Sequence, residues 1–272
     1  MSDDFHFRQA ETRDAEAFVA LIRRAFAPER IGLTIYGAPG IATFIADQLE
    51  SRSAQSARRY MVAEAESRIV GAAELTTSDA EVFLGYIAVD ETLRSRRIAT
   101  KLLAASIAAV RRSTQTQFVL DVFSDNVVAR RWYEGLGMAP DARPSSDWWQ
   151  LPLAAPDSLS SLLATEPLDE SDERYARYGF SEIVVLSDAK RYTIGLLGDR
   201  YFRCTNAAAV FDAALIRTLG AIDSSRQLLI HSLDPALDLE RLGARRLFSS
   251  VRLRAPLDEI ERRLAAAAHH DG

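Results

Sequence analysis

The stretch Tyr86-Ile-Ala-Val-Asp-Glu-Thr-Leu-Arg-Ser-Arg-Arg-Ile-Ala-Thr-Lys-Leu-Leu103 decides the fold of this chain. An apolar strand ends at Val89, a turn with three arginines spans residues 94–97, and an apolar helix begins at Ile98. A helix N-terminus presents backbone N–H groups without helical partners, and the helix dipole adds positive charge there. Arginine side chains add charge-assisted donors that suit phosphate oxygens. The stretch therefore predicts a site for a phosphate-bearing ligand.

The patterns on either side of this stretch predict a mixed α/β domain. Strands at 60–65, 69–76 and 81–89 are separated by short polar turns and should form an antiparallel meander. The helix from Ile98 has a broad apolar face, which is typical of packing onto a sheet. The remaining expected elements are a strand at 5–9, amphipathic helices around 18–26 and 41–51, a strand at 117–122, a helix at 126–136 that Gly137 ends, and a strand at 148–153.

The second half of the chain has a similar order of elements after a change in composition. Residues 154–174 are rich in Pro, Ser, Asp and Glu and are interpreted as a linker, with a short helix at 158–163. The elements expected beyond it are strands at 180–186, 191–197 and 201–205, a helix at 206–219, a strand at 227–232, a short helix ending at Gly243, a strand at 246–254 and a helix from Leu257.

This order repeats the first half from its second strand onward. The helix-to-strand spacing from Ile98 to Val119 recurs between Ala208 and Leu229, and Leu136-Gly137 recurs as Leu242-Gly243. We interpret the pattern as a degenerate internal duplication. The alternative is chance similarity between two α/β segments. The predicted domains are residues 1–153 and 175–272, joined by residues 154–174.

Composition narrows the class of protein. Of the 272 residues, 48% are hydrophobic and 26% are charged, which is typical of a globular protein. The net charge of -5 disfavours nucleic acid and anionic membrane as partners. No apolar run approaches the ~20 residues that span a bilayer, and the polar start is unlike a secretory signal, so we expect a cytoplasmic protein. Cys204 is the single cysteine, which excludes an intrachain disulfide and a cysteine-based metal site.

Two motifs resemble the GCN5-related N-acetyltransferase (GNAT) family. Residues 87–103 are similar to its acetyl-CoA motif, Gln/Arg-x-x-Gly-x-Gly/Ala before an apolar helix, with Arg94 and Ala99 at the first and last positions. Residues 125–138, Asp-Asn-x-x-Ala-x-x-x-Tyr-Glu-x-Leu-Gly-Met, resemble the family's fourth helix. The resemblance covers residues 5–153 and implies a GNAT fold, in which a mixed, mostly antiparallel sheet is flanked by helices. A second, partial GNAT-like domain would follow it here.

The resemblance also implies a ligand and a set of contacts. Acetyl-CoA would be the co-substrate, and its acetyl group would pass directly to a bound primary amine, with no metal. Asn126 would contact the pantetheine arm, and backbone groups along the open strand would do so as well. The residues implied to bind the cofactor are Ile87, Ala88, Val89, Arg94, Ser95, Arg96, Arg97, Ile98, Ala99, Asn126 and Ala129.

The catalytic groups are predicted from the protons that must move. In GNAT enzymes a tyrosine at the position of Tyr133 commonly protonates the departing thiolate, and this resemblance makes Tyr133 the candidate general acid. The other reading of Tyr133 is a half-buried aromatic that packs under its helix. The incoming ammonium must lose a proton, and Glu74 and Glu81 are the candidate bases. Both could instead be ordinary exposed glutamates.

One departure from the family motif falls at Arg97, where the family has glycine. An arginine fits there if its side chain points outward, unless the backbone needs a positive φ. A non-catalytic acyl-CoA-binding sensor or scaffold is therefore an alternative function. The acceptor stays open between a small-molecule amine and a peptide or protein amine, and the protein between a monomer and a homodimer. The second half lacks an arginine-rich turn, so we expect it not to bind CoA.

Overall fold

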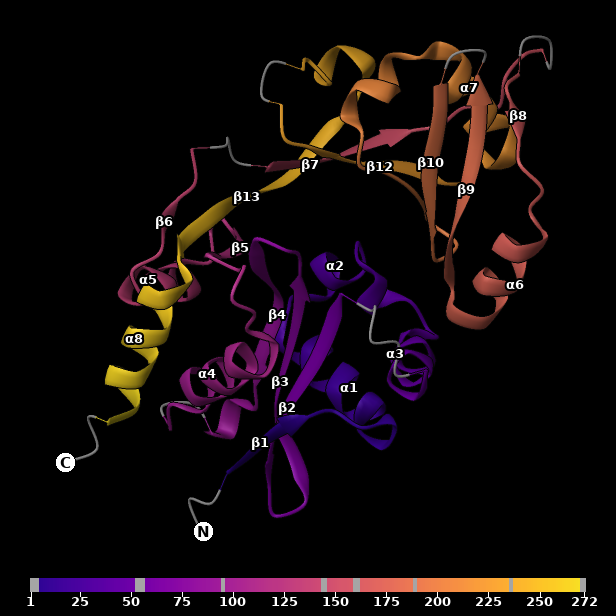
Figure 1. Ribbon diagram of the computed structural model, residues 1–272. Coiled ribbons are helices and arrows are strands. Elements are labelled where there is room, and N and C mark those ends of the chain that lie inside the picture. The colour runs from indigo at the N-terminus through magenta and orange to yellow at the C-terminus, as the bar shows by residue number, and fades with distance from the viewer. Residues whose placement is uncertain are drawn as a thin grey trace. The chain divides into compact units, whose positions relative to one another are not determined.

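The computed structural model describes residues 5–51, 57–93, 96–142, 146–158, 162–187, 190–234 and 237–269 (Figure 1). The chain forms two compact units that interleave along the sequence. Unit 1 comprises residues 1–28, 42–142 and 251–272, and unit 2 comprises residues 29–41 and 143–250. This division differs from the predicted boundaries at residues 153 and 175. The last strand expected in the first domain lies in unit 2, and the end of the chain lies in unit 1.

Unit 1 is built on a sheet in the order β1–β2–β3–β4–β5, followed by the second part of β13. The first four strands are antiparallel, as predicted for the meander, and β4 and β5 are parallel. Short β6 pairs with β13 through Leu253↔Pro140. The strands are β1 (His6–Gln9), β2 (Arg58–Ala65), β3 (Arg68–Thr77), β4 (Glu81–Val89), β5 (Gln117–Phe123), β6 (Ala139–Pro140) and β13 (Arg245–Pro256).

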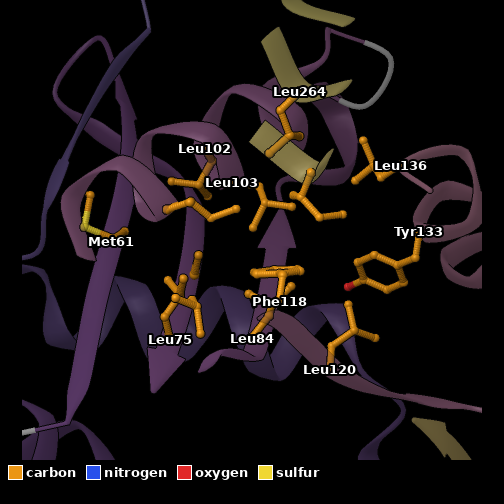
Figure 2. Close-up of a cluster of buried hydrophobic side chains, with 14 of the residues drawn as sticks. Met61, Leu75, Leu84, Leu102, Leu103, Phe118, Leu120, Tyr133, Leu136 and Leu264 are labelled. Atoms are coloured by element: carbon orange, nitrogen blue, oxygen red, sulfur yellow. The ribbon is translucent and has the colours of Figure 1, made fainter. Parts of the chain in front are cut away.

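Helices cover both faces of this sheet. The helices of this part of the chain are α1 (Ala15–Ala25), α3 (Ile41–Glu50), α4 (Ile98–Val110), α5 (Val127–Gly135) and α8 (Leu257–His269), with 3-10 turns η1 (Thr12–Asp14) and η3 (Glu91–Leu93). Phe18 of α1 packs edge-on against Tyr60 of β2, with ring centroids 5.5 Å apart. On the other face, α4 and α8 meet the strands in one apolar cluster that includes Leu103, Phe118 and Leu264 (Figure 2).

Unit 2 has a sheet of the same kind, in the order β13–β7–β12–β11–β10–β9–β8. Strands β11 and β12 are parallel, and the other pairs are antiparallel. The strands are β7 (Ser146–Pro152), β8 (Ala164–Thr165), β9 (Phe180–Ser187), β10 (Lys190–Leu197), β11 (Tyr201–Cys204), β12 (Gln227–Ser232) and the first part of β13. The helices are α2 (Pro28–Ile31), α6 (Asp169–Tyr178) and α7 (Ala213–Asp223), with 3-10 turns η2 (Ile35–Gly37), η4 (Ala207–Phe211) and η5 (Glu240–Leu242).

The two units repeat one arrangement, as the internal duplication predicts. In each, a parallel strand pair is connected through a helix: β4 and β5 through α4 in unit 1, and β11 and β12 through α7 in unit 2. Gly137 and Gly243 follow the equivalent helical turns, and both have positive φ, 84° and 81°. Glycine adopts this left-handed conformation without a Cβ penalty, so both positions can end a helical turn.

Two expectations for the second half differ from the structure. The acidic part of the predicted linker is helix α6, in which three acidic residues occupy the first turn, where they favour the helix dipole, and Gly179 ends the helix at φ 75°. The single helix expected at 206–219 is divided, because Asp212 caps a new helix, α7, after η4. Residues 159–161 of the short helix expected at 158–163 lie outside the described residues. Among the described helices, none is long and apolar enough to cross a bilayer.

Candidate active site

Strand β4 is paired on both sides for only part of its length. It pairs with β5 from Glu81↔Gln117 to Leu84↔Leu120, whereas its pairing with β3 continues to Gly71↔Val89. The β3–β4 register shifts opposite Gly85, and such a bulge bends the strand. Among the described residues, no strand pairs with the β5-facing edge of β4 beyond Leu84. The residues on this edge include Ile87, Ala88 and Val89, which were predicted to contact acetyl-CoA.

The arginine-rich turn follows directly. Arg94 and Ser95, both predicted to bind the cofactor, lie outside the described residues. Arg96 is exposed, and α4 begins at Ile98, with a first helical bond from Lys101 N–H to the carbonyl of Arg97. The N–H groups of Ile98 and Ala99 stand in the first turn, where a helix has no partners of its own to offer. Among the described residues, strand β4 and the N-terminus of α4 therefore follow one another as the sequence predicts.

Arg97 has a positive φ, the backbone conformation that would disfavour an arginine at this position. Its φ is 54° and its ψ is 18°, which is the left-handed region that favours glycine. A non-glycine residue in this region costs about 1–2 kcal/mol. The guanidinium does not extend freely into solvent, since Nη1 donates a 2.8 Å hydrogen bond to the carbonyl of Ala267 in α8.

Tyr133 points from α5 into the apolar cluster of unit 1. Its side chain is 7% exposed, and Figure 2 shows the ring directed toward Leu120 and Phe118. Trp132 packs beside it with ring centroids 4.8 Å apart. Burial raises the pKa of Tyr133, so the hydroxyl stays protonated at neutral pH. No described residue hydrogen-bonds to this hydroxyl, which leaves it able to donate to a ligand.

Asn126 precedes α5 rather than lying on it. Its Oδ1 accepts a 3.1 Å hydrogen bond from Ala129 N–H, which caps the helix. The helix expected at 126–136 thus begins at Val127, with Asn126 as its cap. The cap uses the amide oxygen of Asn126 and leaves its amide N–H groups to donate.

The two candidate bases lie in different surroundings. Glu74 is 5% exposed, and its carboxylate lies 3.5 Å from Nε of Arg58. A Cβ built at Gly85 would be 3.5 Å from Oε1 of Glu74, so this carboxylate lies under the β4 bulge. Burial and the Glu74 carboxylate together raise the pKa of Tyr60. Glu81, at the start of β4, is bound 2.8 Å from Nη1 of Arg254.

Tyr133 and Glu74 are related through the register of β4 and β5. Leu120, which the Tyr133 ring faces, is paired with Leu84, and Leu84 precedes the bulge residue Gly85 above Glu74. Tyr133 thus faces a residue of the last β4–β5 pair, and Glu74 lies under the next residue of β4. Gly85 and Arg58 were not among the residues predicted for this site. A glycine inside an alternating strand was the available signal for the bulge.

The equivalent helix N-terminus in unit 2 is occupied by a carboxylate of the chain itself. Asp212 Oδ1 accepts hydrogen bonds from Ala214 N–H and Leu215 N–H at 3.0 and 3.3 Å. Tyr192 donates a 2.7 Å hydrogen bond to Oδ2. This hydrogen bond raises the pKa of Tyr192 to about 12 and lowers that of Asp212. Among the described residues of the whole chain, no group of three or more His, Cys, Asp or Glu side chains could hold a metal ion.

Comparison with known proteins finds a matching family and similar folds. Residues 30–138 match the Acetyltransferase (GNAT) family. A mycothiol acetyltransferase of Brachybacterium faecium is 32% identical over 145 residues, which make up 49% of this chain and 40% of that protein. The match thus spans well under two thirds of the relative's length.

Two solved structures are similar over nearly the whole chain. A tandem GNAT protein from the clavulanic acid biosynthesis pathway has a TM-score of 0.68 and 16% identity, over 93% of this chain and 98% of that one. A GCN5-related N-acetyltransferase from Sphaerobacter thermophilus has a TM-score of 0.58 and 12% identity, over 94% and 96% of the two chains. At these identities the likeness establishes the fold, which includes the second half of the chain.

Proposed function

We propose that this chain, whose residues 30–138 match the Acetyltransferase (GNAT) family, is an acyltransferase that transfers the acetyl group of acetyl-CoA to a primary amine. The proposal rests on Tyr133, which faces Leu120 of the last β4–β5 pair, and on Glu74, which lies under the next residue of β4, Gly85. A proton donor and a proton acceptor are what direct acyl transfer to an amine requires.

In this proposal acetyl-CoA, the acetyl donor, lies along the edge of β4 that β5 leaves unpaired beyond Leu84. Backbone groups of Ile87 to Val89 bind the pantetheine arm in an extended form, and the amide of Asn126 donates to it beside Ala129. The pyrophosphate lies at the N-terminus of α4, where the first-turn N–H groups and the helix dipole favour negative charge. Arg94, Ser95 and Arg96 belong to the same turn and complete the proposed binding segment.

The reaction needs two proton transfers. The acceptor ammonium gives a proton to Glu74, directly or through a water molecule, and the free amine attacks the thioester carbonyl carbon. The tetrahedral intermediate then collapses, the carbon–sulfur bond breaks, and Tyr133 protonates the departing thiolate. Both carboxylates lie near an arginine, Glu74 at 3.5 Å from Arg58 and Glu81 at 2.8 Å from Arg254, and Glu74 is the better candidate base because it lies under the bulge.

The test of this function is release of free CoA thiol from acetyl-CoA against a panel of amines. We expect amine-dependent release with at least one small-molecule or peptide amine, and the relative's name gives priority to small molecules. A hydrolysis control without amine corrects for spontaneous thioester loss. Saturable acetyl-CoA binding without release for any amine would instead support the sensor or scaffold function.

A further inference from the structure

Helix α8 contacts α4 and α5, the two helices of unit 1 that carry the motifs predicted to bind acetyl-CoA (Figure 1). At its start, Asp258 and Glu261 lie 2.5 and 3.7 Å from the guanidinium of Arg111, which follows α4. In its middle, Arg263 donates a 3.3 Å hydrogen bond to the carbonyl of Gly135 in α5. The helix nearest the end of the sequence therefore connects α4 with the helix that carries Tyr133.

Apolar packing holds α8 in this position. Leu257, Ile260 and Leu264 lie on one face of the helix, and each is at most 1% exposed. They belong to the same cluster as Leu102 and Leu103 of α4 (Figure 2). The opposite face is charged, as expected for an amphipathic helix that packs its apolar face against the core. These anchors lie before residue 265, so the last turn of α8 is held by other contacts.

Arg97 reaches that last turn. Its Nη1 donates to the carbonyl of Ala267, 170 positions along the chain. Carbonyl groups at a helix C-terminus lack helical donors and carry partial negative charge, which suits a guanidinium. A charge-assisted hydrogen bond of this kind is similar in size to the strain of the left-handed conformation at Arg97. The contact therefore explains how an arginine is accommodated at the motif position that favours glycine.

We propose that Arg97 is a positioning residue, which fixes the phosphate-binding turn by holding it to the last turn of α8. The inference rests on the proposed function, since it concerns the same donor site. In it, α8 acts as a strut for the N-terminus of α4, and the N–H groups of Ile98 and Ala99 are aimed at the pyrophosphate because Arg97 is tethered. The contrasting role is a direct phosphate ligand, with its guanidinium turned toward the donor.

A double-mutant cycle on the full chain separates these roles. The variants are Arg97→Ala, which removes the guanidinium and keeps the left-handed strain that glycine would relieve, Ala267→Pro and the combination. The readout is the dissociation constant of acetyl-CoA measured by calorimetry. Proline at residue 267 clashes with the carbonyl of residue 263 and breaks the last turn while leaving the apolar anchors intact. If Arg97 is a tether, each single variant weakens binding about tenfold, and the combination weakens it no further.

Controls keep the outcome interpretable. Arg262→Ala removes an exposed arginine of α8 that pairs within the helix with Glu259, and it should leave acetyl-CoA binding unchanged. Ala267→Gly is a milder variant of the last turn, to be used if melting shows that the proline variant is misfolded. Additive losses, or a loss with Arg97→Ala but none with a folded Ala267→Pro variant, would overturn the tether. A wild-type chain that binds no acetyl-CoA would overturn the function itself, and this inference with it.

Discussion

Tyr133 combines a polar hydroxyl with an apolar setting, and this combination yields a clean test of its role. Tyr133→Phe should lower kcat about a hundredfold, which is a usual scale for losing a general acid. The affinity for acetyl-CoA should stay nearly unchanged, because the ring still fills its place against Leu120. The Tyr133 hydroxyl has no hydrogen-bond partner among the described residues, so losing it should not lower the melting temperature. Wild-type turnover in this variant would make Tyr133 a packing residue only.

Glu74 and Glu81 form a matched pair for identifying the base. Glu74→Gln should lower kcat/KM about a hundredfold near neutral pH. The deficit should shrink at higher pH, because an amine that has already lost its proton to solvent needs no base. Glu81→Gln should stay close to wild type in kcat/KM at every pH. A larger loss for Glu81→Gln than for Glu74→Gln would reverse the assignment.

The sequence motifs identified single residues of the candidate site but not the backbone geometry of those residues. The second motif led to Tyr133 and Asn126, yet the cap that places Asn126 before α5 depends on a local hydrogen bond. The motif marked Arg97 as a departure, but its positive φ and its contact with Ala267 required the fold. A contact between residues 170 positions apart leaves no local pattern in a single sequence.

The N-termini of helices α4 and α7 predict how many molecules of acetyl-CoA one chain binds. In α7 the Asp212 carboxylate already accepts the first-turn N–H groups, so a pyrophosphate there would meet a like charge and lose two donors. We therefore expect a calorimetric titration with acetyl-CoA to give one site per chain. Tyr192→Phe and Asp212→Ala should leave that site unchanged in affinity. A stoichiometry near two would contradict this prediction.

Most elements could be predicted because their apolar spacing is regular. The meander of β2, β3 and β4 and helices α4 and α5 were expected within a few residues of their observed bounds. Helix α6 was missed because its first turn carries three acidic residues, a composition shared with linkers. The break before α7 was missed because Asp212 acts as a cap only when the chain around it leaves the helix.

The amino-acid composition changes near residue 154, but this change does not mark where the chain divides into units 1 and 2. Strand β13 is continuous, yet residues 245–250 belong to unit 2 and residues 251–256 to unit 1. The earlier segment 29–41 belongs to unit 2, although its neighbours belong to unit 1. The backbone N–H of Gly40 donates to the carbonyl of Tyr178, and such long-range contacts decide the units. A single sequence carries no record of them.

This division predicts that a chain ending at Leu153 will be insoluble. It would lack α8 and the last part of β13, and the side chains that pack against Leu257, Ile260 and Leu264 would face solvent. An apolar surface of that kind is prone to aggregate, and each buried leucine or isoleucine that is lost removes ~2 kcal/mol of stabilisation.

A second design supplies the matched control, because Asp141 N–H donates a 2.9 Å hydrogen bond to the carbonyl of Arg252. Residues 142 and 251 can thus be joined by a short Asn-Gly turn. The joined chain keeps all of the unit 1 segments and residues 29–41, and it omits residues 143–250 of unit 2. We expect this joined chain to be soluble and to bind acetyl-CoA, and the chain ending at Leu153 to aggregate, as judged by light scattering. A soluble, fully active chain ending at Leu153 would show that α8 is dispensable, and would contradict its role as a strut for the donor site.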